Sequence, residues 1–576
     1  MKQKWFPALS VSFGLGCLHL LTGASVETGR QFIWLPLLAL AWAGAKFFWQ
    51  RDDKRLKTSF GIMGGLFVMF FALNLRLEAM DRTGWDGLAL CALCGLCLGA
   101  SAAEGFIRVF EALGRLREPI GWSVRKAFWV SFAVVLLCWL PVLLACYPGI
   151  TGYDIDNQAY QIYTGDYNTH HPLLHTLFLQ LFMELGKWLM NDYSFGYGLH
   201  TIAQHVLLAL AMAYSLRWLA RVRCPRVLWF GTLIFFALSP QNAMLASSGI
   251  KDVLFSAVML VLAVEMVRFL TETERENKKS AWIINILLTA LACMLRNNTV
   301  YGLVLLVPLC ALVWRKQLGL RVLAVVLAGM LVGIAGAAGL KAATDAKEGS
   351  VREKLFVPCQ QLARVYFVYG LDHPVGYECR EVMPFVEDYT PERADAVKRQ
   401  AVVDTPDRLI RFLKLWVREA FHYPIEYIDA LLLNTKAYWA LDDVSFATTY
   451  DETEPRGCLL MWHNTNTQLE IQNLWPQVKD FCYRMFVLNE YQRFPVLWTL
   501  LHPAFYTWLL VFVMIRSLLC RQKGILFASG ILASYLLTLL LGPCVLIRYS
   551  YYLMLALPVL LGASYANHTQ EVIKRV

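Results

Sequence analysis

Residues 127–158 read AFWVSFAVVLLCWLPVLLACYPGITGYDIDNQ, an apolar run that ends abruptly in a polar, acidic segment. The run Ala127–Cys146 carries no charged residue. As a helix it is long enough to cross the roughly 30 Å hydrocarbon core of a bilayer. Similar runs recur along the chain. This pattern predicts an all-α integral membrane protein with about fourteen transmembrane helices of roughly 20 residues each.

The composition supports the same fold class. Hydrophobic residues make up 57% of the chain, charged residues only 17%, and the mean hydropathy is +0.46. Soluble domains usually carry about 25% charged residues. The net charge of +10 resides mostly in short loops between apolar runs, which is the pattern of cytoplasmic loops. We therefore expect membrane lipid rather than nucleic acid as the partner of these basic residues.

Basic loops alternate with loops that have few cations, which places both termini in the cytoplasm. The apolar segment Leu173–Met190 tests this assignment, because counting it as a span would turn every later basic loop outward. We predict an interfacial or re-entrant helix on the outer face, since its polar residues recur at roughly helical spacing. A true span that breaks the charge rule is the alternative.

Four regions follow from this topology. Residues 1–126 form an N-terminal four-span region, and residues 496–576 a C-terminal three-span region. Between them lie a core, residues 127–340 with an outer acidic loop at 147–198, and a mainly helical extracytoplasmic domain, residues 341–495. That domain contains four cysteines whose pairing as disulfides the spacing leaves open, namely Cys359, Cys379, Cys458 and Cys482.

The outer acidic loop is the first candidate site. Carboxylates beside a membrane can act as a general base or hold a divalent cation, and imidazoles can share either role. The metal requirement stays open, and so does a structural role in which Asp154 or Asp156 caps a helix that begins at Asn157. The candidate residues of this loop are Asp154, Asp156, Gln158, His170 and His171.

Three cations at the ends of apolar runs map to the same outer side: Lys251, Arg296 and Arg548. An ionisable group at membrane depth is costly and therefore suggests function. Together these side chains could bind a phosphate or pyrophosphate. The alternative is that each snorkels to the interface or pairs with a carboxylate. Gln361 and Arg364, in the segment PCQQLARVY, could face the same site, although a surface helix would look similar.

Short motifs carry a resemblance to known families: YPGITGYDIDNQ, THHPLLHT, GIKDVLF, LRNN, PCQQLARV and IRYSYY. A span followed by an acidic outer loop and a His-Pro step resembles the GT-C superfamily of membrane glycosyltransferases. His171-Pro172 has one proline where those enzymes often have two. The chain is also similar to an uncharacterised bacterial family of multi-spanning membrane proteins. The four N-terminal spans fall outside the GT-C-like core.

The resemblance implies transfer of a sugar from a polyprenyl-phosphate-linked donor to a glycan, lipid or protein acceptor of the envelope, at the outer face of a bacterial plasma membrane. It implies that Asp154 is the base, with Asp156 as second choice, and that His171 orients donor or acceptor. Lys251, Arg296 and Arg548 would neutralise the leaving phosphate. A transporter or flippase of a lipid-linked sugar or envelope polymer is the alternative, and the gathering of polar residues on one face favours the enzyme.

Overall fold

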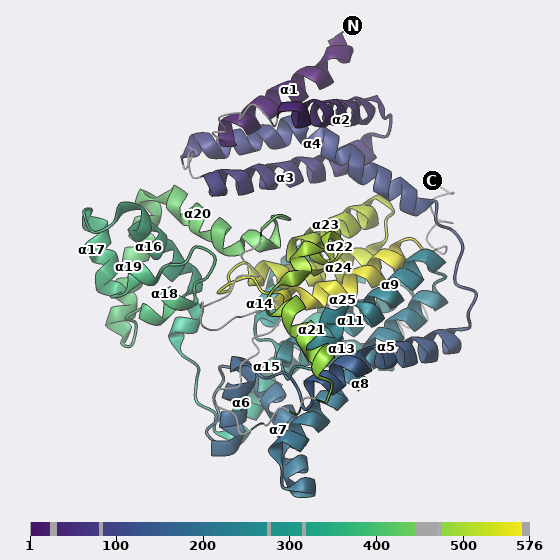
Figure 1. The fold of residues 1–576 in the computed structure, drawn as a ribbon, viewed down its shortest axis with the longest axis vertical. Helices are drawn as coiled ribbons and strands as arrows, with labels where there is room; N and C mark the ends of the chain where they lie inside the picture. Colours follow the sequence, from purple (N-terminus) through teal and green to yellow (C-terminus); the bar gives the residue numbers. More distant parts are fainter. Residues whose placement is uncertain are drawn as a thin grey trace.

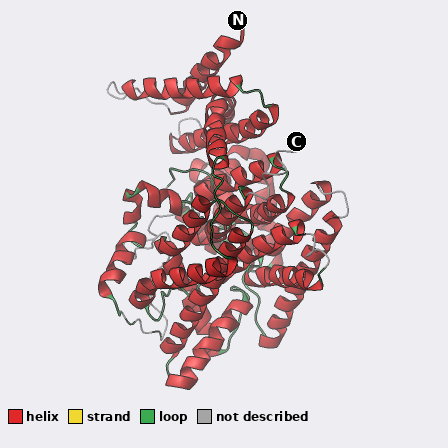
Figure 2. Ribbon diagram, turned by 90° about the vertical axis from the view of Figure 1, so that its right-hand side faces the viewer, coloured by secondary structure: helices red, strands yellow, loops and turns green. Residues whose placement is uncertain are grey.

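The computed structural model describes residues 2–22, 31–79, 84–272, 278–313, 318–443, 469, 472 and 474–566. Within these ranges the regular secondary structure is helical, apart from isolated β-bridges, as Figure 2 shows. The prediction of an all-α fold is therefore confirmed.

The first four helices form a layer of their own at the top of Figure 1. Helices α3 and α4 pack closely because Gly64, Gly95 and Gly99 bring their backbones together: a Cβ at Gly64 would lie 2.3 Å from the Gly99 carbonyl oxygen. The layer comprises α1 (Lys2–Thr22), α2 (Gln31–Gln50), α3 (Lys54–Ala79) and α4 (Trp85–Gly114).

The central bundle combines helices from the middle and the end of the chain (Figure 1). Its middle part contains α5 (Val124–Cys146), α6 (Tyr153–Thr164), α7 (Leu173–Met190), α8 (Tyr193–Arg221), α9 (Arg226–Leu238), α10 (Pro240–Ala246), α11 (Lys251–Thr271), α13 (Lys279–Leu295), α14 (Asn298–Val313) and α15 (Leu318–Thr344). Its last part contains α21 (Pro476–Phe486), η5 (Glu490–Arg493), α22 (Pro495–Leu501), α23 (Pro503–Leu519), α24 (Lys523–Leu539) and α25 (Ile547–Ser564).

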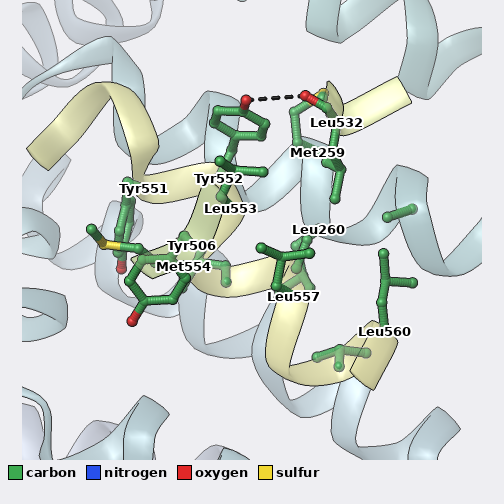
Figure 3. Close-up of a cluster of buried hydrophobic side chains, with 14 of the residues drawn as sticks. Met259, Leu260, Tyr506, Leu532, Tyr551, Tyr552, Leu553, Met554, Leu557 and Leu560 are labelled. Atoms are coloured by element: carbon green, nitrogen blue, oxygen red, sulfur yellow. Dashed lines mark hydrogen bonds between the residues drawn. The ribbon is translucent and has the colours of Figure 1, made fainter. Parts of the chain in front are cut away.

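Helix α25 lies at the centre of this bundle. Leu553–Leu557 are fully buried, so the helix is apolar on all sides and enclosed by its neighbours. Figure 3 shows Leu553 and Leu557 packed against Met259 and Leu260 of α11, with the Tyr552 hydroxyl donating to the Leu532 carbonyl at 3.1 Å. The first turn of the same helix carries Arg548.

The outer helices between α15 and α21 have a hydrophobic core of their own, which includes Leu362, Met383 and Phe412. They lie to the left of the bundle in Figure 1. A buried ion pair of 2.6 Å between Arg76 of α3 and Asp429 of α20 joins them to the N-terminal layer. They comprise η1 (Val351–Lys354), α16 (Phe356–Tyr369), α17 (Pro374–Val382), η2 (Val386–Asp388), α18 (Asp395–Gln400), α19 (Pro406–His422), α20 (Pro424–Thr435) and η3 (Lys436–Tyr438).

Six described helices are long and apolar enough to cross a membrane, and up to eight if each of two bent pairs is one span. The bent pairs are α9 with α10, at 51°, and α22 with α23, at 67°. Several other predicted spans are shorter helices, such as Lys279–Leu295 and Lys523–Leu539. A helix of 17 residues reaches only about 25 Å, less than the hydrocarbon core. The structure thus supports a membrane protein with fewer full-length spans than hydropathy alone predicts.

The ambiguous segment Leu173–Met190 folds as a single helix, α7, and is not among the described helices apolar enough to span. It packs on α8 through residues such as Leu179 and Met183 and exposes Leu181, Leu185 and Trp188. In Figure 1 it projects from the bottom of the bundle. A helix with one packed face and one exposed apolar stripe is what the interfacial interpretation expects.

Candidate functional site

Two loops far apart in sequence are tied together beneath the site. The Ile150 N–H donates to the Ser247 carbonyl at 2.8 Å. The Tyr197 hydroxyl, from α8, donates to the Ile150 carbonyl at 2.7 Å and accepts from the Gly249 N–H at 2.9 Å. One buried phenol therefore links the loop that leads into α6 to the loop that leads into α11.

Glycine is required on both sides of the Tyr197 ring. A Cβ at Gly149 would lie 2.5 Å from the ring, and one at Gly249 would lie 2.8 Å from it. Both distances are shorter than a normal van der Waals contact, so any side chain there would push the two loops apart. The close approach of backbone to ring sets the separation of α6 and α11.

We expect Tyr197→Phe to lower the free energy of unfolding by about 1–3 kcal/mol, because it leaves a buried carbonyl and a buried N–H without their partner. Thermal unfolding of the detergent-solubilised chain measures this effect. Tyr160→Phe is the matched control, since Tyr160 is an exposed tyrosine of α6. Equal melting temperatures for the two variants would contradict the linking role.

Helix α6 begins at Tyr153, earlier than the start at Asn157 considered above, and Gly152 occupies the N-cap position without a side-chain cap. Asp154 and Asp156 therefore lie in the first turn of the helix, and the proposal that either caps a helix starting at Asn157 is wrong. The position is still favourable for a carboxylate, because the helix dipole is positive there. The first turn directs Asp154 toward α11 and α25.

Asp154 is the centre of a buried charge cluster. Its Oδ2 lies 2.8 Å from Lys251 Nζ and 3.1 Å from an Arg548 guanidinium nitrogen. The three side chains are only 17%, 10% and 12% exposed, respectively. Lys251 Nζ also lies 3.1 Å from His171 Nδ1. The structure thus brings together four of the predicted residues from the acidic loop, α6, α11 and α25.

The protonation of the cluster follows from its geometry. Burial alone would raise the pKa of the Asp154 carboxyl, but the charges of Arg548 and Lys251 outweigh burial and hold that pKa well below its usual range. Burial, reinforced by the Lys251 charge, holds the pKa of His171 well below its usual value. An ammonium can only donate, so His171 Nδ1 accepts from Lys251 and the ring proton resides on Nε2. The cluster therefore combines a carboxylate, two cations and a neutral imidazole.

Arg296 lies next to this cluster but has a different partner. It forms an ion pair with Asp252, the residue that follows Lys251 on α11. Its guanidinium group lies 5.2 Å from the centre of the Tyr549 ring, and that of Arg548 lies 5.3 Å from the same ring. One tyrosine thus has two guanidinium groups beside it, each in cation–π range.

Gln158 and Asp156 lie away from the charge cluster. The fully buried Gln158 amide oxygen contacts His175 Nδ1 at 2.7 Å and accepts from the Thr176 hydroxyl at 3.3 Å, which fastens α6 to α7. Asp156 is buried on another face of α6, since two residues turn a helix by about 200°. Asp154, which contacts Lys251 and Arg548, is therefore the central carboxylate of the charge cluster.

His170 is exposed and packs edge-to-face against the His171 ring, with 4.6 Å between the ring centres. It borders the cluster without a described bond to Asp154, Lys251 or Arg548.

Gln361 and Arg364 belong to the core of the outer helices. The Gln361 side chain donates to the Tyr427 carbonyl at 3.2 Å and accepts from the Trp416 indole at 2.7 Å. The Arg364 guanidinium group lies 5.6 Å from the centre of the Phe367 ring. The Gln361 contacts hold α16 against α19 and α20, whereas the Arg364 contact with Phe367 lies within α16 itself.

The described residues contain no group of three or more His, Cys, Asp or Glu side chains placed to hold a metal ion. Cys359 and Cys379 are buried free thiols in the core of the outer helices, and Cys482 is a buried free thiol of α21. Cys458 lies outside the described residues, so its pairing stays open.

The fold and the site define an all-helical membrane protein with a cluster of charged side chains around Asp154. Residues 164–574 match a family described as a family of unknown function (DUF6020), and the chain belongs to that family. No curated protein and no solved structure matches the chain. Lys251, Arg296, Arg548 and His171 lie within the matched segment, whereas Asp154 precedes it.

Tyr197, Asp252 and Tyr549 are the members of the site that sequence reasoning missed. Tyr549 follows Arg548 directly in the sequence. An aromatic residue next to a cation in an apolar run could have predicted a cation–π contact at the site. Tyr197 carries no such signal, because its role depends on two loops that only the fold brings together.

Proposed function

We propose that the chain is a membrane glycosyltransferase that transfers a sugar from a polyprenyl-phosphate-linked donor to an envelope acceptor. The observation that carries the proposal is the contact of Lys251 and Arg548 with one carboxylate oxygen of Asp154, at 2.8 and 3.1 Å, in a buried position. Two cations facing one carboxylate leave an excess positive charge. The polyprenyl phosphate that leaves in the transfer is a dianion, so it matches that charge better than the single carboxylate does.

Asp154 occupies the place of the phosphate in the free protein. Arg548 can hold a phosphate with two parallel hydrogen bonds, and Lys251 adds a point charge. Once phosphate takes these partners, Asp154 loses two stabilising cations and gains an anion as neighbour. Both changes raise the pKa of its carboxyl. Substrate binding thus converts a paired carboxylate into a competent base.

The transfer step then follows. Asp154 accepts the proton of the acceptor hydroxyl while that oxygen bonds to the anomeric carbon of the sugar. The bond between the anomeric carbon and the phosphate oxygen breaks, and its electron pair leaves with the polyprenyl phosphate. Lys251 and Arg548 stabilise the charge that develops on this leaving group, and the His171 Nε2–H can donate to it or to the acceptor. Arg296, held beside Tyr549, adds to the positive field.

The charge pattern supports the remaining features of the proposal. With both termini in the cytoplasm and about fourteen membrane-crossing or re-entrant segments, the cluster faces the outside of a bacterial plasma membrane. Helix α7 then lies in the outer interface, with its exposed stripe of Leu181, Leu185 and Trp188 in lipid. A lipid-linked donor reaches the cluster from that leaflet.

The direct test is transfer of a labelled sugar from a set of polyprenyl-phosphate donors to envelope acceptors by the purified full-length chain. We expect product with the wild-type chain and none above background with Asp154→Ala. Asp166→Ala is the matched control, because this aspartate of the same outer loop is 57% exposed and pairs with Lys347 at the surface. Equal product from Asp154→Ala and the wild-type chain would remove Asp154 from the reaction.

The bent helix pairs favour a second candidate, a transporter of a lipid-linked sugar. Broken helices near a binding site are typical of transporters, and α10, after the 51° bend, ends just before the loop that leads to Lys251. Movement of labelled donor across reconstituted vesicles, without any transfer product, would favour this candidate over the enzyme.

A further inference from the structure

An apolar cavity of about 610 Å³ lies between α5, α7, α8, α11 and α13. Three of these helices line it with side chains seven positions apart: Leu207 and Tyr214, Leu254 and Val261, and Leu288 and Leu295. Seven residues of helix rise about 10 Å, so the cavity is a groove that runs along the bundle. Its volume falls in the range of ligand pockets.

One end of the groove adjoins the charge cluster. Leu295 directly precedes Arg296, and Leu254 lies one turn after Lys251 on α11. Leu174, near the start of α7, follows His171 by three residues. Three separate elements therefore carry a groove residue and a cluster residue side by side. A ligand with a phosphate at the cluster has its first chain atoms at the mouth of the groove.

The groove has Tyr214 at the end away from the charge cluster, and one of its sides is exposed. The Tyr214 hydroxyl contacts Glu265 and Arg268. Along the side, Leu207 is 43% exposed and Leu291 is 38% exposed, so the groove opens onto the lipid-facing surface of α8 and α13. A chain that fills the groove can pass out between these leucines into the bilayer.

We infer that this groove binds the phosphate-proximal segment of a single apolar chain, such as a prenyl chain, whose phosphate occupies the site of Lys251 and Arg548. The inference rests on the proposed function and names where the lipid part of that substrate lies. Because the groove is only about 10 Å long, it holds a short segment, and the rest of a longer chain lies in the membrane.

The groove selects by shape more than by hydrophobicity. Lipid tails are as apolar as leucine side chains, so moving a chain from the bilayer into the groove gains little from the hydrophobic effect. Selectivity therefore comes from the packing of the ligand chain against the groove and from the alignment of that chain with the phosphate site. A bulky side chain in the groove therefore excludes the ligand sterically, and a chain longer than the groove binds no more tightly than a short one.

The test compares ligands and paired variants of the full-length chain in detergent, by native mass spectrometry titration. The ligands are geranyl phosphate, a long-chain polyprenyl phosphate, inorganic phosphate and a two-chain phosphatidate. Leu291→Trp narrows the open side of the groove. Leu287→Trp is its matched control, one turn earlier on α13, 51% exposed and outside the groove. Ala257→Trp fills the groove from α11.

We expect the wild-type chain and Leu287→Trp to bind geranyl and long-chain phosphates equally, and at least about tenfold more tightly than inorganic phosphate. Leu291→Trp should lose this preference and keep its affinity for inorganic phosphate. Unchanged binding of geranyl phosphate by both Leu291→Trp and Ala257→Trp would overturn the inference, and so would equal binding of phosphatidate. If the groove variants behave as expected but no sugar is transferred, the groove stands and the proposed enzyme activity fails.

Discussion

Asp154→Asn is expected to abolish transfer and, at the same time, to bind prenyl phosphate about tenfold more tightly than the wild-type chain. A positioned general base contributes about 10²- to 10⁴-fold to a rate, and an amide cannot take the acceptor proton. The amide also no longer competes with phosphate for Lys251 and Arg548, which lie 2.8 and 3.1 Å from the carboxylate. A hydrogen bond to a charged group is worth about 1.5–3 kcal/mol, which sets the scale of the gain.

The opposite changes in turnover and affinity make this variant informative. A residue that merely supports the fold would lower both quantities together. A carboxylate that holds the substrate directly would lower affinity on removal. The measurement is a titration with prenyl phosphate beside a single-turnover transfer assay. Weaker binding by Asp154→Asn would contradict the exchange of carboxylate for phosphate.

Lys251→Met has the second large expected effect, on stability as well as on binding. It removes one of the two cations that contact the Asp154 carboxylate, and loss of one hydrogen bond to a charged group costs about 1.5–3 kcal/mol because Arg548 still pairs with that carboxylate. We expect a lower melting temperature, no detectable binding of prenyl phosphate and no transfer. Thermal unfolding in detergent and the same titration measure these quantities.

The double variant Asp154→Asn with Lys251→Met tests the ion pair that Lys251→Met retains. It leaves the Arg548 guanidinium group without its carboxylate partner, so it should be less stable than Lys251→Met alone. Transfer should stay absent, because neither the base nor the phosphate ligand is present. A double variant as stable as Lys251→Met would contradict a stabilising pair between Asp154 and Arg548.

The charged residues of the site were predictable to a useful degree because membrane burial makes charge costly. Asp154, Lys251 and Arg548 stand out in the sequence for that reason, although 97 positions separate the first two and 394 separate Asp154 from Arg548. These three side chains can contact one another because each lies near the start of its helix and the three helix ends lie together. Their functional roles stay proposals.

Other features depended on packing that hydropathy does not encode. Arg296 pairs with Asp252 because α13 ends beside the start of α11. Gln361 and Arg364 form a helical pattern that suits either a site or a domain core. The Gln361 contact with Trp416 belongs to the core, whereas Phe367, beside Arg364, is 55% exposed. The described residues contain six to eight helices that could span a membrane rather than about fourteen, and short or bent helices in a bundle are as apolar as full-length ones.

The groove beside the site was beyond sequence reasoning altogether. Its lining residues are ordinary leucines, valines and alanines of apolar helices, which a lipid-facing or a packed surface would also carry. Only the arrangement of α7, α8, α11 and α13 leaves space between them.

The most direct test of the central claim is a cryo-EM map of the full-length chain with a prenyl phosphate. We expect phosphate density within hydrogen-bond distance of Lys251 Nζ and the Arg548 guanidinium group. We also expect the Asp154 carboxylate to be displaced from both cations, and chain density to enter the groove beside Leu254. Bound lipid phosphate elsewhere on the chain, with Asp154 still paired to Lys251 and Arg548, would contradict the proposed site.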